Sequence, residues 1–191
     1  MRRALCLLAV VILAACGVPD DDDPRLIADG EAPLDLAPST VTTVEAGDDT
    51  VAVFFINQDT RRLAAVARPV AELTPRAAIE QLLLGVTPDD PPELVSAIPP
   101  GTVLLDASVD ESTLTLDLGT EVEGGGIQSV AGDQQLLAFA QLVQTATGQT
   151  PSGIRAVRFL VEGDPIDAAT EAGVSSEPVG RDDYPTLAPG G

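Results

Sequence analysis

The chain has 191 residues, of which 30 are aspartate or glutamate and 10 are basic, so its formal net charge at pH 7 is −20. All the basic residues are arginine, and there is no lysine, histidine or tryptophan. Such a charge opposes nucleic-acid binding, which needs a basic surface. Without histidine, Ser-His-Asp and Cys-His catalytic sites and histidine-liganded zinc are excluded, and no cofactor is expected.

The first 15 residues have the features of a bacterial export signal. Two arginines precede an apolar run over residues 4–15, which is too short to span a bilayer because a membrane helix needs about 20 apolar residues. The sequence Leu13-Ala14-Ala15-Cys16 at the end of the run resembles the lipobox of bacterial lipoproteins. The resemblance implies cleavage between Ala15 and Cys16 and attachment of fatty (palmitate-type) chains to Cys16.

The alternatives for this segment are a buried core helix and an ordinary cleaved signal. If Cys16 carries lipid, the protein is held at the outer, extracytoplasmic side of the cell membrane. No other cysteine remains after cleavage, so the folded part depends on its core alone. Residues 16–48 are acidic, proline-containing and without period, which predicts a flexible tether; the run Asp20–Asp23 is either a weak cation site or part of this spacer.

The folded region, expected over residues 49–187 with a short tail over 188–191, begins with two strands and a helix. The segment 50–57, "TVAVFFIN", is β-branched, aromatic and apolar from 51 to 56, which predicts a central strand buried on both faces. A second strand is expected over 63–70. Thr74 as N-cap, Pro75 in the first turn and Gly85 as the stop predict a helix between them.

The middle of the chain predicts a connector, a hairpin and a second helix. The proline-rich residues 87–102 are expected to be irregular. Alternating apolar residues then predict two strands joined at 110–112. The residues expected to share a face within each strand are Val103, Leu105, Ala107 and Val109 in the first, and Leu114, Leu116 and Leu118 in the second. After a glycine-rich loop, a helix is expected from Asp133 to about Thr147, ended by Gly148.

The last predicted strand lies in "GIRAVRFLVEGDPI" (153–166) and ends at a tight turn over 162–164. Pro165 begins at most a short return strand, and the remainder is expected to be loop. The order β-β-α-β-β-α-β predicts a single α+β domain with a mixed sheet and two helices packed on one face.

This order of elements, and the turns and loops that separate them, resemble those of the GerMN domain, named from a spore-germination protein. The pieces that carry the resemblance are "VAVFFI", "LAAVARPV", "AIEQLLLGVTPDD", "SAIPPGTVLLDASVDESTLTLDL", "LAFAQLVQTATG", "IRAVRFLVEGDPI" and "RDDYPTL". The resemblance implies a non-catalytic envelope module that takes part in protein assembly, in some members during sporulation. It supplies no catalytic residues, and the single copy without an accompanying enzyme domain argues against a direct hydrolase role.

Two other functions remain open on the residues alone. A carboxylate-dependent wall hydrolase would use a pair among Asp106, Asp110 and Asp117, although these positions are also those of solvated turn and strand residues. A module that binds cell-wall polymer or a small ligand suits a location near peptidoglycan. Sugar sites usually stack rings on aromatic side chains, however, and the chain has a single tyrosine, Tyr184.

Binding to another envelope protein is the function we expect, with two candidate surface features. Phe54 and Phe55 alternate in a strand, so one of them should point away from the helices and form, with Leu160, an apolar face that a partner or the protein's own tail covers. Arginines also cluster early in the folded region, and they either bind a partner's carboxylates or pair within the chain. They are Arg61, Arg62, Arg68 and Arg76.

Overall fold

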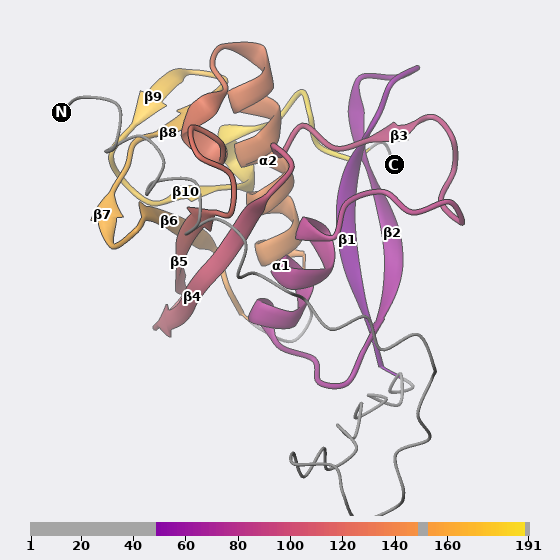
Figure 1. The fold of residues 1–191 in the computed structure, drawn as a ribbon, viewed down its shortest axis with the longest axis horizontal. Coiled ribbons are helices and arrows are strands. Elements are labelled where there is room, and N and C mark those ends of the chain that lie inside the picture. The colour runs from indigo at the N-terminus through magenta and orange to yellow at the C-terminus, as the bar shows by residue number, and fades with distance from the viewer. Residues whose placement is uncertain (1–48, 149–152, 190–191) are drawn as a thin grey trace, which may run out of the picture. The chain divides into compact units, whose positions relative to one another are not determined.

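The computed structural model describes residues 49–148 and 153–189, which lie in one compact unit. The predicted signal, Cys16 and the tether lie outside the described residues. None of the helices in the described part is both long and apolar enough to cross a bilayer. The α+β class, the single domain and the order of the seven predicted elements are confirmed (Figure 1).

The first sheet is built on a hairpin. Strands β1 (Asp49–Asn57) and β2 (Arg62–Val70) pair antiparallel along their full length, and the short β3 (Leu94–Val95) pairs with the end of β1, giving the order β2-β1-β3. The hairpin turn is fixed by Asn57, whose Oδ1 accepts the backbone N–H groups of Asp59 and Thr60, each at 3.0 Å. Arg61 closes the turn in the left-handed region, with φ 56°.

The second sheet is mixed and has the order β10-β6-β5-β4, with the short β10 (Val179–Gly180) at one edge. Strands β4 (Thr102–Asp110) and β5 (Thr113–Thr120) form the predicted hairpin, and β5 runs parallel to β6 (Ala156–Val161). Residues Leu114, Leu116 and Leu118 of β5 are fully buried, as their alternation predicts.

The two helices begin and end where the sequence signals predict. Helix α1 (Pro75–Leu83) is capped by Thr74, whose Oγ1 accepts the N–H of Ala77 at 3.1 Å. Gly85, with φ 78°, turns the chain after it, because glycine adopts this conformation without a steric penalty. Helix α2 (Asp133–Thr147) is buried continuously from residue 138 to 146.

The strands are divided among separate sheets instead of forming one, and the position of α2 explains this. Figure 1 shows α2 between the β1–β2 hairpin and the strands of the second sheet, and it contacts both β1 and β6. Gln141 Nε2 donates to the Phe54 carbonyl at 3.0 Å, and Thr145 Oγ1 accepts the Phe54 N–H at 3.1 Å. Two helix side chains thus occupy the edge of β1 where another strand would pair.

The predicted face of β4 is interrupted by a β-bulge. The register shifts between Leu104 and Asp106, so Leu105 is the extra residue. Leu105 lies over Gly119, the partner of Val103, and is 50% exposed, whereas beyond the bulge Ala107 pairs with the buried Leu116 on the opposite face. One additional residue in a strand reverses the faces beyond it, and the apolar pattern alone contains no signal for it.

The short return strand allowed at Pro165 is present as β7 (Asp164–Pro165), but the prediction of a loop beyond it is wrong. The remaining elements are β8 (Ala168–Thr170), β9 (Gly173–Ser175), β10 (Val179–Gly180) and the 3₁₀ turn η3 (Arg181–Asp183), together with the earlier 3₁₀ turn η2 (Ile127–Ser129). Tyr184 is fully buried and donates its hydroxyl hydrogen to the Ala169 carbonyl at 2.8 Å. These strands of two or three residues are too short to show a period.

Candidate functional site

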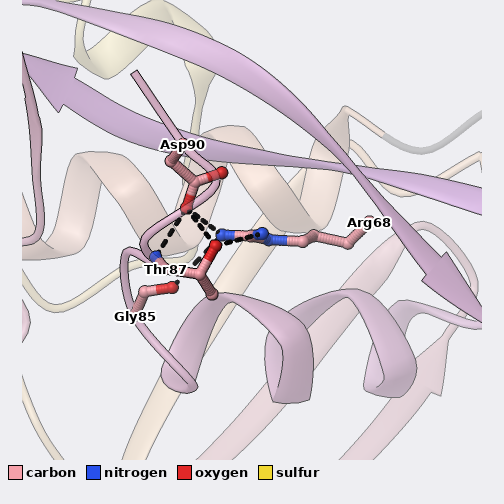
Figure 2. A network of polar contacts seen from close by, with 4 residues as sticks. All are labelled: Arg68, Gly85, Thr87 and Asp90. Atoms are coloured by element: carbon pink, nitrogen blue, oxygen red, sulfur yellow. Dashed lines mark hydrogen bonds and ion pairs between the residues drawn. The ribbon is translucent and has the colours of Figure 1, made fainter. Parts of the chain in front are cut away.

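Arg68 is the centre of a polar network that fixes the chain after α1 (Figure 2). Its guanidinium donates to Thr87 Oγ1 at 3.1 Å and to the Gly85 carbonyl at 3.4 Å, and it forms an ion pair with Asp90. The same guanidinium lies 5.7 Å from the centre of the Phe55 ring, within cation–π range. The Arg68 and Asp90 side chains are 12% and 3% exposed, so this arginine serves the fold and is not available to a partner.

The charge state of Asp90 follows from its surroundings. Burial raises the pKa of its carboxyl, but hydrogen bonds from Thr87 and Arg68 and the attraction of the guanidinium outweigh burial. The pKa of Asp90 is therefore lowered, and the ion pair is maintained at all ordinary pH values.

The other three candidate arginines are accessible to solvent. Arg76 pairs at 3.2 Å with both Glu80 and Asp106, in contacts that are largely exposed. Arg61 and Arg62 are exposed at the hairpin turn and form no ion pair with any described residue. Pairing within the chain therefore accounts for Arg68 and Arg76 and leaves two cations for other contacts.

The predicted apolar face around Phe54 is not a partner surface, because Phe54 is only 7% exposed. Phe54 and Phe55 are 7% and 0% exposed, so neither presents an apolar face to solvent, although adjacent strand residues point to opposite faces. A Cβ placed on Gly148, at the end of α2, would be 2.7 Å from Phe54 Cε2. The C-terminal segment borders the same hairpin, since Leu63 donates its N–H to the Leu187 carbonyl at 3.0 Å.

Leu160, the other apolar candidate, is half-buried in β6, where it pairs with Pro165 of β7. It lines neither of the two grooves described next.

A first groove, which we call the hairpin groove, has a volume of about 410 Å³ and lies beside the β1–β2 turn. Its apolar wall is built by Leu136 and Leu137 of α2 together with Leu187. Arg61 and Asp133 supply one charge of each sign. The sequence therefore located one residue of this groove, Arg61, but not the leucines, which come from distant parts of the chain.

A second groove, which we call the α1–β4 groove, has a volume of about 380 Å³ and was not predicted. Leu83 and Leu84 at the end of α1 face Val103 and Leu104 of β4 across it. Its charged lining residues are Glu80 and Glu121, and both are acidic. The sequence contained one local signal for this groove: an apolar residue, Leu84, directly precedes Gly85, at which the helix ends.

The carboxylates considered for catalysis are brought together only in part. Asp106 and Asp117 are directly opposite one another in the β4–β5 pair, whereas Asp110 lies at the end of the strand. Asp106 is bound to Arg76, and Asp117 accepts the Gly163 N–H at 3.0 Å. Neither Asp106 nor Asp117 lines either groove, and each already has a partner within the chain.

Comparisons with known proteins agree with this architecture. The first GerMN domain of the sporulation protein GerM from Bacillus subtilis superposes with a TM-score of 0.54 at 15% identity, covering 70% of this chain and 98% of that domain. The tandem GerMN domains of GerM give a TM-score of 0.53 at 21% identity, covering 74% of this chain and 47% of theirs. At these identities the likeness shows a shared fold. No curated protein matches the chain in sequence.

The family comparison covers most of the folded region. The model of the Germane family, described as "Sporulation and spore germination", matches residues 52–167. The match runs from within β1 to the residue before β8 and includes both helices and every strand of the two main sheets except β10. Because it spans more than half of the chain, the protein belongs to the Germane family of sporulation and spore germination domains.

Proposed function

We propose that this protein is a lipid-anchored, extracytoplasmic envelope protein whose GerMN domain acts by binding another envelope protein and not by catalysis. The docking role depends above all on one observation: two surface grooves of the described domain have apolar walls. Exposed apolar surface next to polar rims is typical of sites of protein association.

The anchor is supported by the sequence at positions 13–16. Two acyl chains anchor a protein stably where a single chain does so marginally, because each buried CH₂ contributes about 0.8 kcal/mol. A tether of about 30 residues, with a root-mean-square reach of roughly 30 Å, would allow the domain to meet partners near the membrane.

Burial of the single tyrosine favours protein over polysaccharide as the ligand. Tyr184 is fully buried, and the chain has no tryptophan. The described surface therefore lacks the tyrosine or tryptophan rings on which sugars usually stack.

The anchor is tested by Cys16→Ser. Wild-type cells labelled with a palmitate analogue should show the label on this protein, whereas the variant should remain unlabelled and uncleaved at Ala15. Labelling that persists in the variant, or a wild type without lipid, contradicts the anchor.

The docking role is tested by chemical cross-linking in intact cells, with an unrelated lipoprotein as the control. We expect a protein partner that is enriched over the control. Co-sedimentation with isolated wall material, reversed by soluble wall fragments, would instead support the polymer-binding alternative. Release of wall fragments that disappears in Asp106→Asn would support the hydrolase.

A further inference from the structure

Three exposed apolar side chains gather around the α1–β4 groove. Leu84, which lines the groove, is 72% exposed, and Val122 and Leu105 are 54% and 50% exposed. Val122 lies against Gly101, a lining residue, with its Cγ2 2.9 Å from where a Cβ would be. Leu105 lies over Gly119, the strand partner of the lining residue Val103. The groove and its surroundings therefore form one apolar patch.

The patch is held in place by backbone hydrogen bonds. The Val122 N–H donates to Thr120 Oγ1 at 3.1 Å, and its carbonyl accepts from that same hydroxyl at 3.0 Å and from the Gly125 N–H at 2.9 Å. The Leu84 N–H donates to the Glu80 carbonyl at the end of α1. Because hydrogen bonds hold the backbone that carries these side chains, this chain would lose little conformational entropy when a partner binds.

The rim of the patch is acidic. Glu80 and Glu121 line the groove, and Glu123 follows Val122 in the same exposed turn. Arg76, bound to Glu80, is the one cation that an ion pair among the described residues places there, and Asp106 also binds it. With a chain charge of −20, this surface attracts a basic partner and repels a second copy of itself.

We infer that the α1–β4 groove binds a basic segment of a partner protein, which inserts an apolar side chain between α1 and β4 and places flanking lysine or arginine side chains beside Glu80 and Glu121. The inference rests on the proposed docking function and gives that function a place and a partner chemistry. It makes no use of Arg61 or of the hairpin groove.

The experiment uses the full chain in intact cells, with a photo-crosslinking amino acid introduced singly at three exposed positions. Leu84 reports on the α1–β4 groove and Gln58 on the hairpin groove. Val174 is the control, because it is 74% exposed and lines neither groove. We expect a cross-linked protein from Leu84, joined at a segment with lysine or arginine beside a large apolar residue, and no such product from Val174.

Charge variants test the rim. Replacing both acids, Glu80→Gln with Glu121→Gln, should lower the yield of the Leu84 product roughly fivefold, because two rim charges each contribute modestly to binding. The matched control is Glu177→Gln, which removes an exposed acid that lines neither groove, and it should leave the yield unchanged.

The outcomes separate this inference from the docking function. A partner captured from Gln58 but not from Leu84 overturns the inference and leaves the docking function standing. The absence of any protein product from all three positions overturns both. A Leu84 product that contains only a second copy of the chain or only lipid, an acidic or uncharged partner segment, or a yield unaffected by the double substitution also overturns the inference.

Discussion

At the scale of single residues, buried side chains form the hydrogen bonds of backbone groups that have no backbone partner. Gln141 of α2 is fully buried and uses both ends of its amide, since Nε2 donates to the Phe54 carbonyl and Oε1 accepts the Ala97 N–H at 2.7 Å. It therefore joins β1 to the chain that leads into β4. Arg68 and Asp90 join β2 to the turn after α1 in the same way.

Replacing Gln141→Leu should lower the free energy of unfolding by about 2 kcal/mol, because each buried backbone group left without a partner costs about 1–3 kcal/mol. Urea denaturation measures this loss. The control is Gln128→Leu, at an exposed position, which should change stability by less than about 0.5 kcal/mol. Equal effects at the two positions would contradict the role of Gln141.

Replacing Asp90→Asn should cost about 2 kcal/mol at neutral pH, because it leaves the guanidinium of Arg68 largely buried without its counter-charge. Glu80→Gln, which breaks an exposed pair, should cost under about 1 kcal/mol.

The Asp90 effect should depend on pH with a definite sign. Because the pKa of Asp90 is lowered in the folded state, the ionised carboxyl contributes its full stabilisation above its ordinary pKa of about 3.9. That contribution is lost as pH falls through the lowered pKa. The difference between wild type and Asp90→Asn, measured by urea denaturation, should be constant from about pH 8 to 5 and shrink below that. A difference that grows in acid would contradict the ion pair.

At the scale of elements, the short strands after β6 act as part of the core. Strand β8 contacts α2, and β10 pairs with β6, so the C-terminal segment covers the central helix. Tyr184 fixes this segment, with its ring fully buried and its hydroxyl bonded to Ala169 of β8.

Truncating Tyr184→Ala should destabilise the domain by about 3–5 kcal/mol through loss of buried ring and the cavity left behind. Tyr184→Phe, which removes only the hydroxyl, should cost about 1 kcal/mol. Thermal unfolding followed by circular dichroism compares them. If Tyr184→Ala were as mild as Tyr184→Phe, the segment would not be part of the core.

Tyr184 should also limit stability in alkali. Burial, and then the neighbouring Asp183, raise the pKa of its hydroxyl well above the usual range. Its contribution is therefore complete below the ordinary pKa of about 10 and is lost as pH rises toward the raised value. In urea denaturation, wild type should lose stability above about pH 10 more steeply than Tyr184→Phe.

At the scale of the whole molecule, charge is poorly balanced. The described residues contain three ion pairs, shared between Arg68 and Arg76, whereas the chain carries a net charge of −20. The remaining carboxylates repel one another in the compact state. The same repulsion opposes self-association and favours basic partners.

Sodium chloride should therefore raise the melting temperature of the purified protein. The rise should occur mostly below about 0.2 M salt, because the Debye length is about 10 Å at 0.1 M and falls below typical spacings between surface charges beyond that. Differential scanning calorimetry measures it. A melting temperature that falls as salt is added would show that surface attraction outweighs repulsion.

The sequence by itself determined the elements whose signals are local. Thr74, Pro75 and Gly85 define the ends of α1, and alternation over residues 103–118 defines a hairpin, because capping and pleating depend on neighbours within a few positions along the chain. The order of these elements determined the α+β class and carried the family resemblance.

Only the tertiary structure decided which side chains are exposed. Phe54 is buried because α2, about 90 residues later in the chain, lies along the edge of β1. A bulge adds one residue to β4, so the exposed Leu105 and Ala107, two positions apart, lie on opposite faces. Both grooves join segments from separate parts of the chain. Burial depends on contacts between distant residues, and neither periodicity nor composition specifies which segments will meet.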